Sequence, residues 1–178
     1  MINPEFVKRI REQREKVART PFFILVWGPA TTPPSPVGNK RLAIREHLSK
    51  EFGAENVVFS EDDDPDLQDM RDTMGDRAAE FYQASAADVI IVLAESIGSI
   101  TEVALYDRAL AGKSLIFVEK RPLERQGFAS QAYALLKIEP VEPEEWQSCE
   151  RIRRLCLRFA ETMRVEKYKL EKYKSESS

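Results

Sequence analysis

A six-residue apolar run, Val89–Ala94, constrains the fold more than any other stretch of the chain. A run of this length, rich in β-branched residues and led by Asp88, is typical of a strand buried on both faces. A short polar turn follows, and a helical period then begins at Ile100 and ends at Gly112, where a left-handed cap residue belongs. A second buried strand, 114–118, comes at once. The stretch therefore predicts a β-turn-α-β unit, with its turn at the carboxyl end of the first strand.

Strands and helices alternate through the rest of the sequence, which indicates an α/β protein. Further strands are predicted at 22–27, 57–59 and 137–141. Helices are predicted from Pro4 to Arg19, from Asn39 to Phe52, from Pro65 through Phe81, at 127–136, and from Glu144 onward as one long helix. We therefore expect a Rossmann-like, doubly wound parallel sheet of about five strands flanked by helices, with an extra N-terminal helix and a long C-terminal helix.

The length of 178 residues is enough for one domain with a full core and helical additions. We expect a basic helix at 1–20, the α/β domain at 21–142, and an amphipathic helix with a tail at 143–178. The second half of this last helix projects beyond a domain of this size. It either pairs with another subunit, which would make a homo-oligomer, or frays.

One side of the N-terminal helix is dense in basic residues, which are Lys8, Arg9, Arg11, Arg14, Lys16 and Arg19. A solvated helix face is the default interpretation of such a pattern, and an acidic partner or a phosphodiester is the alternative. The net charge of −3 gives no general reason to expect nucleic acid as a partner.

The turn after the first central strand has two interpretations. Ser99 and Glu102 have the spacing of a capping box, in which the serine caps a helix and the glutamate reaches back to its amide. The exposed amides at a helix N-terminus also make an anion site. In that case Gly98 lets a ligand approach the backbone, Ser96 and Ser99 donate to phosphate or sugar oxygens, and Glu102 is a carboxylate aimed at the ligand.

The pattern Ser96-x-Gly98-Ser99-x-x-Glu102 after an Asp-led apolar strand resembles the nucleoside 2-deoxyribosyltransferase superfamily. That group includes the deoxynucleoside 5'-monophosphate N-hydrolases and, more distantly, the cytokinin-activating phosphoribohydrolases. The resemblance implies that Glu102 is the nucleophile that attacks the anomeric carbon, and that Ser96 and Gly98 hold a 5'-phosphate. Transferases acting on free nucleosides tend to carry an aspartate where this chain has Ser96, so the departure favours a phosphorylated substrate.

The resemblance extends to other parts of the chain. Gly28 and Pro29 follow the first strand, where many relatives carry a Gly-Pro pair in a loop that covers the sugar and base; this loop, with prolines 33, 34 and 36, is expected to be irregular up to Gly38. The family keeps an aspartate that protonates or orients the leaving base, for which Asp76 is the first candidate and Asp72 the second. Lys40 or Arg41 could neutralise a phosphate, and surface placement is the simpler interpretation of both.

Composition excludes other classes of function. The chain has no apolar run of membrane-spanning length, and its first residues do not form a signal peptide. Cys149 and Cys156 are too far apart along one helix to form a disulfide, so we expect reduced core thiols in a cytoplasmic protein. The lone His47 has no evident partners, and the acidic run at 61–64 lacks the glycine of a calcium loop. We therefore expect no metal and no cofactor.

The first functional hypothesis is cleavage of an N-glycosidic bond in a nucleotide-type small molecule, with water as acceptor for hydrolysis or a second base for transfer. Relatives that act on nicotinamide dinucleotides as defence effectors make such a substrate an alternative. A second hypothesis is a non-catalytic sensor that binds a nucleotide in the same crevice. In a third, Glu102 only caps a helix of a structural α/β protein.

Overall fold

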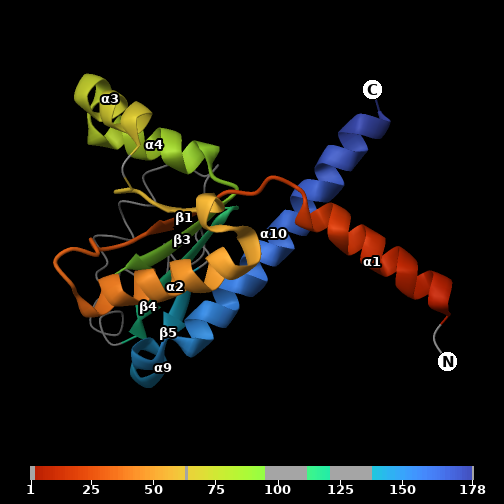
Figure 1. Ribbon diagram of the computed structural model, residues 1–178. Coiled ribbons are helices and arrows are strands. Elements are labelled where there is room, and N and C mark those ends of the chain that lie inside the picture. The colour runs from red at the N-terminus through yellow and green to blue at the C-terminus, as the bar shows by residue number, and fades with distance from the viewer. Residues whose placement is uncertain (1–2, 63, 95–111, 121–137, 178) are drawn as a thin grey trace.

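A single parallel sheet organises the chain (Figure 1). The computed structural model describes residues 3–62, 64–94, 112–120 and 138–177. In spatial order the strands are β2 (Val57–Phe59), β1 (Ile24–Trp27), β3 (Val89–Ala94), β4 (Ser114–Glu119) and β5 (Ile138–Val141). Every neighbouring pair is parallel, so the predicted five-stranded, doubly wound α/β fold is confirmed. The predicted helices at 100–111 and 127–136 lie outside the described residues.

Helices connect and flank these strands. Within the described ranges they are α1 (Pro4–Ala18), α2 (Pro36–Phe52), the 3-10 turn η1 (Ala54–Asn56), α3 (Pro65–Met74), α4 (Asp76–Ala86), α9 (Pro143–Ser148) and α10 (Glu150–Glu176). The expected N-terminal helix and long C-terminal helix are therefore both present. None of the helices in these ranges is long and apolar enough to cross a membrane.

The core has two layers, one on each face of the sheet. On one face, alternate strand residues pack against α2, α9 and α10, with Ile44, Leu48, Ile152 and Cys156 at its centre. On the other face, the remaining strand residues pack around Ala84 of α4. The residues of β1 and β3 are buried throughout, which explains why their sequences are continuously apolar rather than alternating. Each fully buried aliphatic side chain contributes about 1.5–3 kcal/mol of transfer free energy.

The start of α2 differs from the sequence prediction. Helix α2 begins at Pro36 rather than near Asn39, because Ser35 caps it: the Ser35 Oγ accepts a hydrogen bond from the Gly38 amide at 2.9 Å. Proline is well suited to the first turn of a helix, where its missing N–H costs nothing. The irregular loop therefore ends at Ser35.

Two helices that the sequence predicts as continuous are each broken once. The helix after Pro65 stops at Met74, because Gly75 has a φ of +86° and α4 starts anew at Asp76. The long C-terminal helix is interrupted at Cys149, a left-handed residue with a φ of +59° that separates α9 from α10. Apolar periodicity continues through both breaks, so the sequence pattern did not reveal them.

Asp88 joins three elements at the amino edge of the sheet. Its Oδ2 accepts hydrogen bonds from the Phe23 amide at 2.9 Å and from the Lys167 Nζ at 3.0 Å. The residue that opens β3 therefore holds the start of β1 and the middle of α10. The first half of α10 packs across the sheet, with Ile152, Cys156 and Ala160 in the core.

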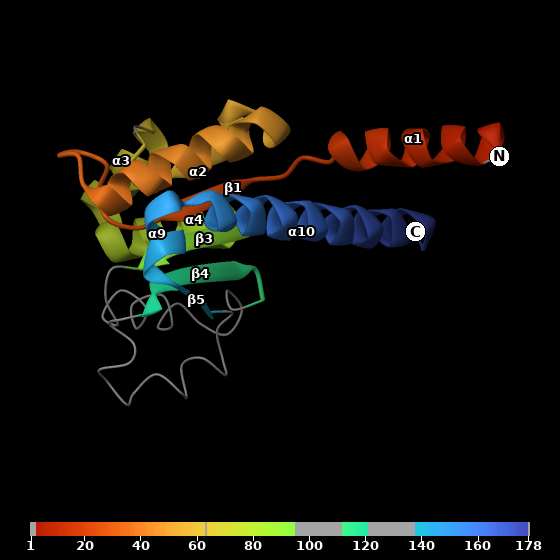
Figure 2. The same cartoon turned by 90° about the horizontal axis from the view of Figure 1, so that it is seen from below.

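Helix α1 and the second half of α10 project together away from the sheet, as both views show (Figures 1 and 2). Helix α1 buries none of its residues. The Tyr168 hydroxyl of α10 lies 3.2 Å from the Gln13 Oε1 of α1, where it donates a hydrogen bond. Phe6, Ile10 and Leu170 leave large apolar surfaces exposed on this projection.

Both cysteines are free and buried, as the sequence predicts. Burial raises the pKa of the Cys149 thiol and, more strongly, that of the Cys156 thiol, so little thiolate exists at neutral pH. We expect neither thiol to react with a small aromatic disulfide reagent in the native protein, and both to react in denaturant. Absorbance of the released thiolate measures this, and rapid native reaction of either cysteine would contradict the packing described here.

Candidate functional site

The order of the strands identifies where a ligand binds in a sheet of this kind. The order is β2-β1-β3-β4-β5, so the connections leave in opposite directions on the two sides of the β1–β3 boundary. In open α/β sheets the ligand crevice lies outside the carboxyl ends of the strands at this switch point. Strand β1 ends at Trp27 and β3 ends at Ala94. The chain after each of these residues therefore starts at the crevice.

Gly28 follows β1 at this edge, as the sequence predicts. Its φ is +154°, and a Cβ there would lie 2.9 Å from both the Leu93 carbonyl oxygen and the Arg41 Cδ. A side chain at position 28 would displace either the backbone of β3 at Leu93 or the side chain of Arg41. The glycine is therefore required by close packing within the protein, a role that the sequence analysis did not predict.

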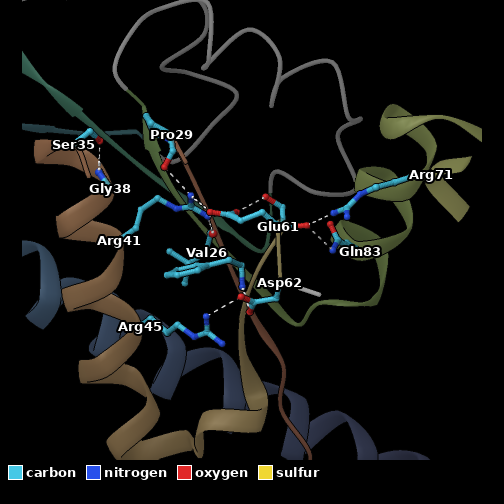
Figure 3. Close-up of polar contacts among 12 residues, drawn as sticks. Val26, Pro29, Ser35, Gly38, Arg41, Arg45, Glu61, Asp62, Arg71 and Gln83 are labelled. Atoms are coloured by element: carbon cyan, nitrogen blue, oxygen red, sulfur yellow. Dashed lines mark hydrogen bonds and ion pairs between the residues drawn. The ribbon is translucent and has the colours of Figure 1, made fainter. Parts of the chain in front are cut away.

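Arg41 connects the loop after β1 to the sheet (Figure 3). Its Nη1 donates to the Pro29 carbonyl oxygen at 2.7 Å and its Nη2 to the Val26 carbonyl oxygen at 2.8 Å. The same two nitrogens form a bidentate pair with the Glu61 carboxylate at 2.7 and 2.8 Å. This geometry is the strongest that an arginine–carboxylate pair adopts. One side chain thus holds the end of β1, the loop after it and the chain after β2.

The structure corrects the predicted surface placement of Arg41. The residue is 0% exposed, and its guanidinium lies 4.4 Å from the centre of the Phe59 ring. A side chain with no exposed surface offers no donor for a ligand to touch. Arg41 therefore positions the loop from inside the protein. The sequence pattern did not predict this role, because a basic residue near a helix start is normally solvated.

Glu61 is the anionic partner in this pair and is partly exposed. Burial opposes its ionisation, but the hydrogen bonds and charge of Arg41 outweigh burial and place the pKa of Glu61 below its ordinary value. The carboxylate is therefore ionised at neutral pH. This role was not predicted, since Glu61 opens an acidic run that is typical of a helix N-terminus.

Further polar contacts fix the chain after β2. Arg45 forms an ion pair with Asp62 at 2.9 Å, and the Asp62 carboxylate also accepts from the Phe59 amide. The Ser60 carbonyl oxygen accepts hydrogen bonds from Arg71 of α3 and Gln83 of α4 (Figure 3). This network was not predicted, because it joins residues from four elements that are distant in sequence. It joins the chain after β2 to α2, α3 and α4.

The side chain of Lys40 lies near Trp146 of α9, away from the pair that Arg41 forms with Glu61. It is half-buried, with its Nζ 3.4 Å from the Pro36 carbonyl oxygen and 5.7 Å from the centre of the Trp146 ring. The ammonium group therefore packs over α9. Its position near the surface agrees with the simpler of its two predicted placements.

Asp72 and Asp76, the candidate acids, are both exposed on the α3–α4 pair. The Asp72 carboxylate accepts a hydrogen bond from the Gln68 Nε2 at 2.9 Å, and Asp76 is the first residue of α4. Among the described residues, neither forms a hydrogen bond or ion pair with the Arg41 network. Gln83 lies seven positions after Asp76, which corresponds to about 10 Å along the helix axis.

Ser96, Gly98, Ser99 and Glu102 lie outside the described residues. Their segment begins directly after Ala94, at the carboxyl end of β3. Within the described ranges, no cluster of three or more His, Cys, Asp or Glu residues could hold a metal ion.

A scan of the chain against protein-family models finds no match, and a search of the curated proteins finds no match either. Support for a function therefore comes from the motif in the sequence and from the arrangement of the described residues.

Proposed function

We propose that the chain cleaves the N-glycosidic bond of a nucleotide-type substrate, held in the crevice between the carboxyl ends of β1 and β3. The observation that supports this most is the strand order, which makes β1 and β3 neighbours at the switch point. Gly28 and Pro29 leave one strand there, and the segment with the Ser96-x-Gly98-Ser99-x-x-Glu102 motif leaves the other. Gly28 and Pro29 therefore lie at the edge of the sheet where the motif segment begins, directly after Ala94.

In the proposed reaction, the Glu102 carboxylate attacks the anomeric carbon of the sugar while the carbon–nitrogen bond breaks. The bonding electron pair leaves with the base, which takes up a proton from an acid such as Asp76 or Asp72. Water then attacks the glycosyl ester and gives a proton to the carboxylate that had protonated the base, which returns the Glu102 carboxylate and releases the sugar phosphate. With a second base in place of water, the same intermediate gives transfer. Ser96, Gly98 and Ser99 would bind the 5'-phosphate.

A release assay tests the proposal. The purified protein is incubated with ribo- and deoxynucleoside monophosphates, free nucleosides and NAD, and free base is measured by chromatography. Base release from one class would support an N-glycosidase and identify its substrate. If no class of substrate releases base but one of them raises the thermal unfolding temperature, the result would instead favour a nucleotide sensor. If no substrate releases base and none shifts the unfolding temperature, the proposal would be overturned.

Ser96 provides a test of the phosphate assignment. We expect Ser96→Asp to weaken binding of a nucleoside monophosphate at least about tenfold, or about 1.4 kcal/mol, because the new carboxylate repels the phosphate. Ser96→Ala removes the hydroxyl without adding charge and serves as the matched control. Isothermal titration with the monophosphate and with the free nucleoside checks this. Equal weakening for both ligands would contradict a phosphate contact at this position.

A further inference from the structure

Helix α1 leaves two large apolar side chains, Phe6 and Ile10, mostly exposed. Phe6 and Ile10 are 58% and 51% exposed, although they share one side of the helix. A helix of 15 residues is only marginally stable in water unless an apolar face is packed. Among the described residues, the hydrogen bond between Gln13 and Tyr168 joins the middle of the helix to α10. The helix therefore has the composition of an element that packs against a further surface.

Helix α1 is also strongly basic, and its charged residues are in solvent. Residues 4–19, named here the basic arm, contain six basic and three acidic side chains. All six basic side chains are exposed. The solvated-face interpretation accounts for these charges, but not for the exposed Phe6 and Ile10 among them.

The α3–α4 pair has the complementary character. Residues 64–86, named here the acidic face, contain six acidic and two basic side chains. Met74, Phe81 and Tyr82 are 56%, 44% and 47% exposed on the same two helices. Acidic residues with three exposed large apolar side chains match a basic helix with two such side chains.

The two surfaces cannot meet within one molecule. The basic arm projects from one end of the sheet domain, and the α3–α4 pair lies at the opposite end in both views (Figures 1 and 2). A second copy of the chain, however, carries an acidic face that the basic arm of the first copy can contact.

We propose that the basic arm of one copy docks on the acidic face of a second copy. Phe6 and Ile10 would pack against Met74, Phe81 and Tyr82, and the surrounding charges would set the orientation. Two copies that exchange arms reciprocally form a closed two-fold dimer, with both arms and both faces occupied. If the contact instead repeats in one direction, it is heterologous and continues to a closed ring or to an open filament.

Salt dependence is the first readout. The Debye length falls from about 10 Å at 0.1 M salt to about 3 Å at 1 M, so assembly through opposite charges weakens as salt is added. In sedimentation velocity we expect dimers or larger species at about 0.05 M salt and high protein concentration, and monomers at about 0.5 M. A chain that stays monomeric at low salt and high concentration would overturn the proposal.

Charge reversal then tests the two surfaces. The pair Arg9→Glu and Arg11→Glu reverses the arm, and the pair Asp66→Lys and Asp69→Lys reverses the face. Each double variant is expected to lose assembly, because like charges then oppose each other. Lys50→Glu with Arg154→Glu has the same change in net charge as the reversed arm but lies elsewhere, and it should assemble as wild type does.

Mixing distinguishes this contact from other dimers. An equimolar mixture of the two reversed variants should assemble again, because each carries the complement that the other needs. A single chain with all four substitutions should also assemble. Recovery in the mixture also shows that both variants are folded. If α1 instead paired with the α1–α10 projection of a partner, reversal of Asp66 and Asp69 would have no effect, and that result would overturn the proposal.

Discussion

Glu102→Gln is expected to lower base release by about 10⁴- to 10⁶-fold, the range of losses that follow removal of one catalytic residue from an enzyme. The amide keeps the size and hydrogen-bonding capacity of the side chain, but it is neutral and does not attack the anomeric carbon. Substrate binding should survive, since the phosphate contacts assigned to Ser96 and Ser99 are unchanged. Single-turnover kinetics with titration of the unreactive variant would separate the two effects.

The competing interpretation makes the opposite prediction for the same variant. If Glu102 only completes a capping box, Glu102→Gln leaves activity intact, because glutamine is also found at this capping position. Glu102→Ala would then lower the free energy of unfolding by about 1 kcal/mol. Glu102→Ala with unchanged stability and no turnover would support the catalytic role, and full activity with reduced stability would support the cap.

Glu61→Ala is expected to reduce the free energy of unfolding by about 3–5 kcal/mol, the cost of leaving a buried charge without its partner. Arg41 is 0% exposed, so its guanidinium cannot turn to solvent when the carboxylate is removed. Urea unfolding followed by circular dichroism measures the loss. A change under about 1 kcal/mol would show that the pair behaves as an exposed ion pair does.

Two further variants sharpen this measurement. Arg45→Met is the matched control, because Arg45 also stacks on Phe59, at 4.6 Å, but its ion pair with Asp62 is partly exposed. Arg45→Met should reduce the free energy of unfolding clearly less than Glu61→Ala does. The double variant Arg41→Met with Glu61→Ala removes the stranded charge, and it should be more stable than Glu61→Ala alone.

The same pair gives the stability a pH dependence with a definite sign. Because the pKa of Glu61 is lower in the folded state than its ordinary value of 4.5, the pair contributes fully above pH 4.5. The contribution is lost as the pH falls below that value and the carboxylate takes up a proton. The stability difference between the wild type and Glu61→Gln should therefore narrow in acid. A difference that is constant down through the acid range would contradict this assignment.

The strands were predictable because burial on both faces leaves a direct mark on the sequence. Val89–Ala94 is apolar at every position, and the structure pairs it with β1 and β4 along its whole length. Helix breaks were harder to predict. Gly75 and Cys149 change the backbone direction without interrupting the apolar period, so the local pattern continues through them.

The candidate site was predictable only where local spacing carries the signal. Gly28 and Pro29 were placed correctly at the edge of β1, since they directly follow an apolar run. The bond between Arg41 and Glu61 spans 20 positions and depends on β1 and β2 being neighbours. No periodicity contains that information, and arginine is rarely fully buried, so its burial could not be anticipated.

The loop after β1 is anchored independently at each end. Arg41 holds the Pro29 carbonyl oxygen at its start, and the Ser35 Oγ bonded to the Gly38 amide fixes its end. Exchange or lengthening of residues 31–34 therefore leaves the strand and the helix in place, at a small entropic cost. A lineage with this scaffold can change what the loop covers without rebuilding the sheet, so ligand preference and fold stability can evolve separately.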